Sequence, residues 1–163
     1  YIQCAKLLSH PYLADKIVNS LVKKIKLNIK KIDIILSPAM GGVIIGNYVG
    51  KKLKKEAIFC ERVEGKFKLR RGFKINKGQR VLIVEDVVTT GKSSKECYNL
   101  IKKYKGKPIG CACLIDRSNN NKFLLKFKLI SQLKLNIPTY YKKKLPDSLK
   151  KIRITKPGSR FIR

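Results

Sequence analysis

Two adjacent carboxylates, Glu85 and Asp86, stand directly after a short apolar run in this chain. A stretch of small hydroxyl and glycine residues follows them at 89–93. Carboxylates accept hydrogen bonds from sugar hydroxyls and help to hold Mg²⁺ through water, whereas free backbone N–H groups at a helix N-terminus bind phosphate. A ligand that satisfies both groups carries a phosphate beside a diol. The stretch 84–93 therefore predicts a site for a ribose 5-phosphate.

The elements that must position this stretch are a buried strand and a helix. Residues 81–84 are aliphatic without alternation, which is typical of a strand that is covered on both faces. The pattern after the hydroxyl residues predicts a helix at 93–104. Open α/β sheets bind their ligands at the carboxyl ends of buried strands. We therefore expect the carboxylates and hydroxyls at that edge of a parallel sheet.

Two other interpretations of the stretch come from the residues themselves. Gly91, Lys92 and Ser93 end like a Walker A loop, but that pattern needs glycine at position 86. Asp86 stands there instead and would direct its charge at the phosphates, which argues against a nucleoside triphosphatase. An acidic strand-to-helix turn without any function remains open at this point.

The rest of the chain alternates strand and helix patterns. Leu13, Ile17, Leu21 and Ile25 recur every four residues and predict an amphipathic helix that begins near Pro11. This order predicts an α/β fold, a parallel sheet flanked by helices with right-handed crossovers. Further elements are expected at 31–36 (strand), 42–54 (helix), 57–60 (short strand), 67–73 (an extended arm pairing back around Glu64 and Gly65), 109–115 (strand), 119–121 (loop) and 123–163 (edge strands and irregular tail).

Size and composition limit the possible classes of protein. A chain of 163 residues is expected to form a single domain, 1–163, and no apolar stretch is long enough for a membrane span. A soluble, cytoplasmic protein without membrane contact is the simplest interpretation. The five cysteines include no C-x-x-C pair and His10 is the one histidine, so no protein metal site is expected. Cys111 and Cys113 share one face of a predicted strand and are expected in the core.

The formal net charge of +29 taken alone would indicate a nucleic-acid partner. The excess is mostly lysine, however, and the lysines are spread along the chain rather than gathered in one stripe of sequence. Anionic substrates also suit a basic protein. We therefore expect no specific nucleic-acid partner.

The stretch 85–93 resembles the phosphoribosyl pyrophosphate motif of the type I phosphoribosyltransferases, most closely that of the orotate phosphoribosyltransferases. It reads Glu85, Asp86, Val87, Val88, Thr89, Thr90, Gly91, Lys92 and Ser93. The resemblance runs over nearly the whole chain. It includes the pyrophosphate-side loop at 37–42, a flexible charged hairpin loop at 61–72, the triplet 116–118 and the segment 156–160.

The resemblance implies transfer of the phosphoribosyl group of phosphoribosyl pyrophosphate to orotate, with Mg²⁺ as cofactor. Catalytic roles are implied for Glu85 and Asp86, which would hold the ribose hydroxyls, and for the loop cations Arg62 and Lys66. The whole stretch 85–93 would bind phosphoribosyl pyrophosphate. The other implied contacts are with orotate (Thr89 and Arg117) and with pyrophosphate (the main chain of Ala39, Met40 and Gly41, and the side chain of Arg70).

The resemblance also implies a homodimer in which the loop at 61–72 serves the neighbouring subunit's site. The family's hood over the base is expected to need a segment before Tyr1. Two alternatives within the fold remain open: a transferase that acts on a purine base, and a non-catalytic regulator that binds phosphoribosyl pyrophosphate. A carboxylate-seeking Arg117 favours orotate over a purine.

Overall fold

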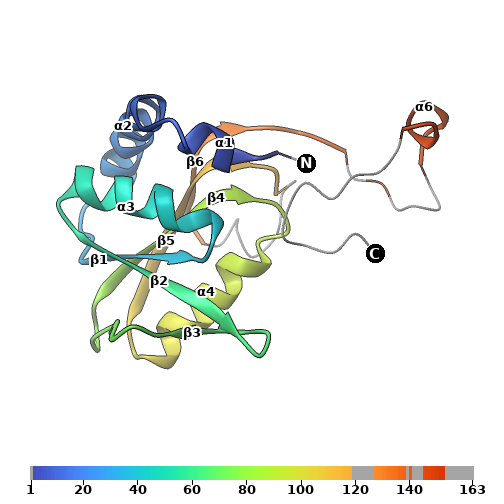
Figure 1. Cartoon of the computed structure of the whole chain (residues 1–163). Coiled ribbons are helices and arrows are strands. Elements are labelled where there is room, and N and C mark those ends of the chain that lie inside the picture. Colours follow the sequence, from blue (N-terminus) through green and yellow to red (C-terminus); the bar gives the residue numbers. More distant parts are fainter. Residues whose placement is uncertain (1, 119–126, 139, 141–144, 153–163) are drawn as a thin grey trace.

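A computed structural model describes residues 2–118, 127–138, 140 and 145–152 (Figure 1). Helices and strands alternate along most of this length, as the sequence predicts. In chain order the elements are α1 (Cys4–Leu8), α2 (Pro11–Asn28), β1 (Ile34–Pro38), α3 (Gly41–Leu53), β2 (Glu56–Val63), β3 (Lys66–Leu69), β4 (Arg80–Val88), α4 (Lys92–Lys103), β5 (Lys107–Asp116), β6 (Leu129–Lys134) and α6 (Asp147–Lys150).

The strands form one six-stranded sheet in the order β3-β2-β1-β4-β5-β6. All neighbouring pairs are parallel except β2 and β3, which form an antiparallel hairpin. Glu64 and Gly65, both with positive φ, make the turn of that hairpin, where the sequence predicts it. The predicted α/β fold with a mainly parallel sheet is confirmed.

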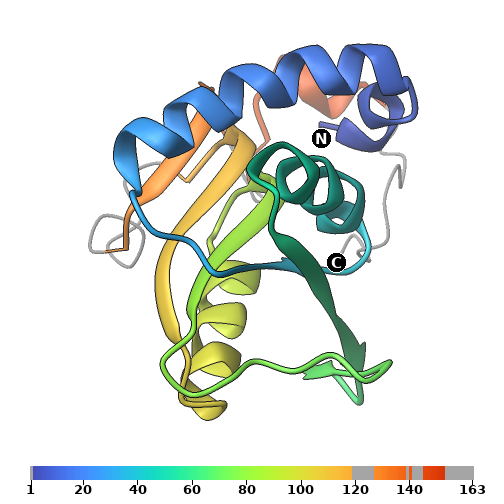
Figure 2. The same ribbon diagram turned by 90° about the vertical axis from the view of Figure 1, so that its left-hand side faces the viewer.

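Helices cover both faces of the sheet. α1, α2 and α3 lie on one face and α4 lies on the other (Figure 1), and α2 runs along the upper side of the twisted sheet in Figure 2. Successive side chains of a strand point to opposite faces, so each central strand contributes to two cores. In β4, Leu82 and Val84 pack under α2 and α3, whereas Val81 and Ile83 pack against α4.

Several boundaries differ from the predicted ones. β1 covers 34–38 rather than 31–36, and β4 continues through the acidic pair to Val88 instead of ending at Val84. β4 extends this far because the neighbouring strand β5 pairs with it to the end. Val87 and Val88 pair with Ile115 and Asp116 of β5. The polar residues therefore belong to the strand itself.

The buried face of α2 also differs from the predicted one. Leu13 is 44% exposed, and the buried side chains are those of Ala14, Val18, Leu21, Val22 and Ile25. A strict four-residue repeat drifts around a helix of 3.6 residues per turn, so the predicted face is wrong at its first residue.

The segment after β5 contains one predicted feature. β6 is an edge strand of the sheet, parallel to β5, and α6 stands apart from the sheet on the right of Figure 1. The loop at 119–121 and the family-like segment 156–160 lie outside the described residues. In the described part of the chain, no helix is both long and apolar enough to cross a bilayer.

The cysteines are free and buried. Cys111 and Cys113 lie in the core on the α4 side, as expected, together with Cys60 and Cys97. Within the described residues, no group of three or more His, Cys, Asp or Glu side chains is arranged to hold a metal ion.

Candidate functional site

The strand order determines where a ligand binds best. From β1 the chain moves outward to β2 on one side, and from β4 it moves outward to β5 on the other. The carboxyl ends of β1 and β4 thus lie at a topological switch point, where open α/β sheets bind ligands. The turn 39–40 follows β1, and the turn 89–91 follows β4. Both stretches that the sequence singles out therefore meet at this point.

Glu85 lies on the α4 face of β4. It is 7% exposed and accepts a hydrogen bond from the hydroxyl of Ser94, which is fully buried in the first turn of α4. The thiol of Cys111 donates to the same hydroxyl at 3.8 Å. Burial, and then the charge of Glu85, raises the pKa of the Cys111 thiol. Ser94 therefore links the carboxylate to the helix that follows the motif.

Asp86 lies on the opposite face of β4, because neighbouring residues of a strand alternate. A Cβ atom added to Gly41 would lie 2.7 Å from one carboxylate oxygen of Asp86, so a larger residue there would displace the Asp86 side chain. On the same face, burial and then the charge of Asp86 raise the pKa of the Cys4 thiol to about 11. The turn after β1 is thus packed directly against Asp86.

The hydroxyl turn after β4 has the features of an anion site. Gly91 has φ of 66° and is an N-cap without a side chain, and the first turn of α4 contains no acidic residue. The Lys92 N–H donates to the Thr90 hydroxyl at 3.4 Å. The first amides of a helix have no intrahelical partner and carry a partial positive charge. The residues that line a small hollow here are Glu85, Val87, Val88, Thr89, Thr90, Gly91, Lys92, Ser93 and Ser94.

The turn after β1 exposes its main chain. The peptide bond between Ala39 and Met40 is cis, and the Met40 side chain is 84% exposed. The Ala39 N–H donates to the carbonyl of Cys60 at 2.9 Å, which fixes this turn to β2. Gly41, at the end of this turn, thus lies beside Asp86.

Arg117 follows β5 directly and is fixed to the end of β4. Its backbone N–H donates to the carbonyl of Val88 at 2.7 Å, next to Thr89. The side chain is partly buried, and its Nε atom is fully buried without a hydrogen-bond partner among the described residues. Asp116 accepts from the N–H of Ser118 at 2.8 Å, and no ion pair in the described structure joins it to Arg117. A planar cation beside the hydroxyl turn is suited to a ligand carboxylate.

Comparison with known proteins agrees with this geometry. Residues 5–137 match the family described as "Phosphoribosyl transferase domain". An orotate phosphoribosyltransferase of Erythrobacter litoralis is 42% identical over 161 residues, which cover 98% of this chain and 83% of the relative. One of Caldicellulosiruptor saccharolyticus is 43% identical over 163 residues, which cover 100% of this chain and 84% of the relative. The chain belongs to the orotate phosphoribosyltransferase family. The resemblance in the sequence is thereby confirmed.

Solved structures add the fold. An orotate phosphoribosyltransferase from Aeropyrum pernix aligns with a TM-score of 0.72 at 20% identity, over 83% of this chain and 78% of that chain. An adenine phosphoribosyltransferase from Thermoanaerobacter pseudethanolicus aligns with a TM-score of 0.69 at 18% identity, over 83% of this chain and 88% of that chain. At these identities the alignments show the shared fold alone.

In this orotate phosphoribosyltransferase-family chain, the hairpin cations do not line the hollow at 85–94. Arg62 is held by its own chain: it pairs with Glu96 of α4 at 2.6 Å, donates to the Gly65 carbonyl at 2.7 Å and covers the ring of Phe67. Arg70 and Arg71 both pair with Glu61. Lys66 is exposed beside the hairpin turn. The charged loop at 61–72 is therefore a β-hairpin with its own ion pairs.

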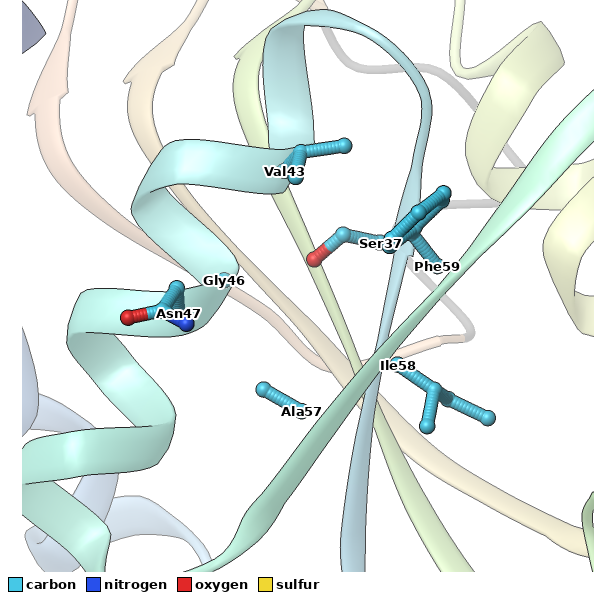
Figure 3. A pocket seen from close by; sticks show the side chains of 7 residues that line it. All are labelled: Ser37, Val43, Gly46, Asn47, Ala57, Ile58 and Phe59. Carbon is cyan, nitrogen blue, oxygen red and sulfur yellow. The ribbon is translucent and has the colours of Figure 1, made fainter. Parts of the chain in front are cut away.

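A separate cavity of about 80 Å³ lies behind the turn after β1. The hydroxyl of Ser37 points from β1 toward α3 (Figure 3), and it is buried without a hydrogen-bond partner among the described residues. A cavity of this volume holds ordered water, which would satisfy the hydroxyl. The lining residues, none of them a predicted substrate ligand, are Ser37, Val43, Gly46, Asn47, Ala57, Ile58 and Phe59.

The sequence interpretation missed the partners that orient the two carboxylates. The hydroxyl of Ser94 reaches back to Glu85, nine residues earlier in the chain. The contact of Gly41 with Asp86 joins residues 45 positions apart. The three-residue separation of Ser94 from Gly91 places it in the first helical turn. In the sequence, this spacing alone indicates that the Ser94 side chain could face the sheet.

Proposed function

We propose that this chain transfers the phosphoribosyl group of phosphoribosyl pyrophosphate to orotate, giving orotidine 5′-monophosphate and pyrophosphate. The bond from the anomeric carbon to the pyrophosphate oxygen breaks, and a bond from that carbon to an orotate ring nitrogen forms. The observation that carries the proposal is the position of Arg117, which is fixed beside the hydroxyl turn and forms no ion pair among the described residues. The orotate phosphoribosyltransferases at more than 40% identity support the same assignment.

The sugar phosphate is assigned to β4 and the start of α4. The 5-phosphate would be held by the backbone N–H groups of the first turn of α4 and by the hydroxyls of Thr89, Thr90 and Ser93. Glu85 and Asp86 would approach the ribose hydroxyls from the two faces of β4. As the leaving group departs, the ribose ring gains positive charge, and two fixed carboxylates beside it would stabilise that charge. The remaining contribution is alignment of the two substrates.

Orotate is assigned to Arg117 and Thr89. A guanidinium forms two parallel hydrogen bonds with a carboxylate, and burial strengthens each of them. Orotate carries its negative charge on the carboxylate at neutral pH, and its reacting ring nitrogen loses a proton as the new bond forms. The departing pyrophosphate oxygens are basic enough to accept that proton.

Pyrophosphate is assigned to the main chain of Ala39, Met40 and Gly41, with cations from the hairpin. Arg62 and Arg70 are paired within their own chain. As the family resemblance implies, this assignment includes a homodimer in which the hairpin reaches the partner's site. Lys66 is the hairpin cation best able to reach out, since it is exposed at the turn.

Magnesium is part of the proposal. The carboxylates of Glu85 and Asp86 are the hard oxygen donors that Mg²⁺ prefers, and a site with few protein ligands suits an ion held largely by substrate oxygens. When bound, the ion would neutralise charge on the pyrophosphate. The proposal also includes a cytoplasmic location, which free, buried cysteines support.

A turnover assay tests the assignment. The full chain is incubated with phosphoribosyl pyrophosphate, Mg²⁺ and in turn orotate, adenine or hypoxanthine. We expect loss of orotate absorbance and release of pyrophosphate with orotate alone. Turnover of a purine without turnover of orotate would contradict the choice of base. Binding of phosphoribosyl pyrophosphate without turnover of any base would indicate a regulator instead.

A further inference from the structure

Lysines that are scattered along the sequence gather at one end of the fold. In a parallel sheet every helix ends, and every following strand begins, at the same edge. The amino ends of the strands and the connections that lead to them carry exposed lysines. We call this set the lysine edge; its members are Lys30, Lys31, Lys54, Lys55, Lys77, Lys102, Lys103, Lys105, Lys107 and Lys128.

The strand registers show that these segments are neighbours. Ile34 at the start of β1 pairs with Glu56 of β2 and with Val81 of β4, and Arg80 pairs with Lys107 of β5. The Gly78 N–H donates to the Lys105 carbonyl at 2.9 Å. The Lys128 ammonium donates to the carbonyl of Asn28 at the end of α2. In Figure 2 the starts of β4 and β5 and the end of α4 lie together at the lower left.

Acids are nearly absent from this edge. One of the two carboxylates at this edge, Asp33, is already bound by Arg80. The Asp33 carboxylate accepts from the Arg80 guanidinium at 2.5 Å and 2.9 Å and from its backbone N–H at 2.7 Å. The other carboxylate at this edge is Glu56. Among the described residues, no member of the lysine edge forms an ion pair. Elsewhere the described acids neutralise cations: Lys52 pairs with Asp15, Arg62 with Glu96, Lys68 with Glu64, Arg70 and Arg71 with Glu61, and Lys150 with Asp147.

Helix dipoles explain only part of the lysine edge. Lys102 and Lys103 lie in the last turn of α4, where a cation is favourable. Lys30, Lys77 and Lys107 lie in connections or at strand starts, where no helix end requires them. Gathering like charges destabilises a compact state through self-repulsion. A polyanion bound there would remove that cost.

We propose that the lysine edge binds the phosphate backbone of single-stranded nucleic acid, at the end of the sheet opposite to the phosphoribosyl site. Five strand starts about 4.8 Å apart form a row of about 20 Å, long enough to contact several phosphates. Tyr104, which is 39% exposed between Lys103 and Lys105, offers a ring on which a base can stack. Lysines act as point charges, so the binding has no sequence preference.

The test compares two triple variants with the same change in net charge. The edge triple is Lys55→Gln, Lys77→Gln and Lys107→Gln; the control triple is Lys6→Gln, Lys16→Gln and Lys23→Gln, all exposed residues away from the edge. The probe is a fluorescent RNA of about 16 nucleotides and mixed sequence. Its dissociation constant is measured by anisotropy between about 50 mM and 200 mM salt.

We expect the edge triple to bind about tenfold more weakly at the middle of that range, and the slope of log K against log salt to fall by about 2. The control triple should bind within about twofold of the unchanged chain. Saturating phosphoribosyl pyrophosphate should not displace the RNA. Unchanged turnover of orotate by the edge triple serves as the check on folding.

Three outcomes would overturn the proposal. Equal weakening by both triples would assign the binding to net charge alone. Displacement by phosphoribosyl pyrophosphate would assign it to the phosphoribosyl site. Edge-dependent binding of phosphatidylserine vesicles without binding of RNA would replace the nucleic acid by a lipid surface.

Discussion

At the amino end of the sheet, Asp33 and Arg80 satisfy each other through both guanidinium contacts and a backbone N–H. At the carboxyl end, Arg117 has a buried Nε without a partner among the described residues. Both arginines adjoin a strand of the same sheet. Arg80 is bound within the chain by an ion pair, whereas Arg117 forms no ion pair among the described residues.

The same contrast applies to the carboxylates of the two ends. Hydrogen bonds from the Arg80 side chain and backbone lower the pKa of Asp33 to about 2. Asp86, by contrast, lies against Gly41, where any side chain would displace the carboxylate. The Asp33–Arg80 pair stabilises the folded chain, whereas we propose that the carboxylates at the carboxyl end bind a ligand. Locally unfavourable arrangements of this kind are expected at functional sites.

The largest expected effect separates the two aspartates. Asp86→Asn keeps the shape of the side chain but removes the charge beside the ribose, so kcat/KM for phosphoribosyl pyrophosphate should fall about 100-fold to 1,000-fold. Asp33→Asn should leave kcat/KM within twofold of the unchanged chain and lower the Tm. Steady-state turnover of orotate and a thermal melt measure both. Comparable loss of turnover in both variants would remove the contrast between the two ends.

The next effect separates the two arginines. Arg117→Ala should raise the KM for orotate about tenfold to 100-fold, the equivalent of losing a charge-assisted hydrogen bond, and leave the KM for phosphoribosyl pyrophosphate unchanged. The KM for orotate of Arg117→Lys should lie between those of the unchanged chain and Arg117→Ala, because an ammonium cannot form two parallel hydrogen bonds with the carboxylate. Arg80→Ala is the matched control, expected to lose stability and keep both KM values. An unchanged KM for orotate in Arg117→Ala would refute the assignment of the base.

A smaller effect concerns Ser94, which orients Glu85 and so acts as a positioning residue. Ser94→Ala should lower kcat/KM for phosphoribosyl pyrophosphate about tenfold by removing one hydrogen bond to a charged group. Ser94→Cys keeps a weak donor of similar size and should recover part of the loss. The KM for orotate should not change, which distinguishes misplacement of Glu85 from general damage to the site. Equal behaviour of the Ala and Cys variants would argue against a role for the hydroxyl.

The smallest effect is the pH dependence of the amino-end pair. An aspartate has a pKa near 3.9 in the unfolded chain, and Asp33 has one of about 2 in the folded chain. The pair therefore contributes stability above about pH 4 and loses it as pH falls through about 2. The difference in Tm between the unchanged chain and Asp33→Asn should be largest at pH 7. It should disappear as the pH falls from about 4 to about 2. A gap that persists at pH 2 would show that the charge of Asp33 is not its cause.

The sequence predicted the elements well where one local pattern decides them. The hairpin around Glu64 and Gly65, the central apolar run at 81–84 and the helix after Gly91 are local patterns, and each is present. The end of β4 could not be read locally. Glu85 and Asp86 look like the start of a loop, but pairing with β5 carries the strand to Val88.

The site residues divide in the same way. The motif 85–93 and Arg117 stand out by residue type, and the strand order brings them together. Other contacts depend on tertiary packing between distant segments. They are the close approach of Gly41 to Asp86, the hydrogen bond from Ser94 to Glu85 and the ion pair of Arg62 with Glu96. Likewise, the lysines looked evenly spread because the edge that gathers them exists only in the folded sheet.

The strand order has a further consequence for how the molecule holds together. Residues 70–79 connect two halves of the sheet. The first half, β1 to β3, contains the turn after β1, and the second carries the motif and Arg117. Each half supplies one side of the site, so a bound phosphoribosyl ligand would bridge the junction between β1 and β4. By mass action, such a ligand at 100 times its Kd adds about 2.7 kcal/mol to the free energy of unfolding. A bound substrate would then stabilise the contact between the two halves of the sheet.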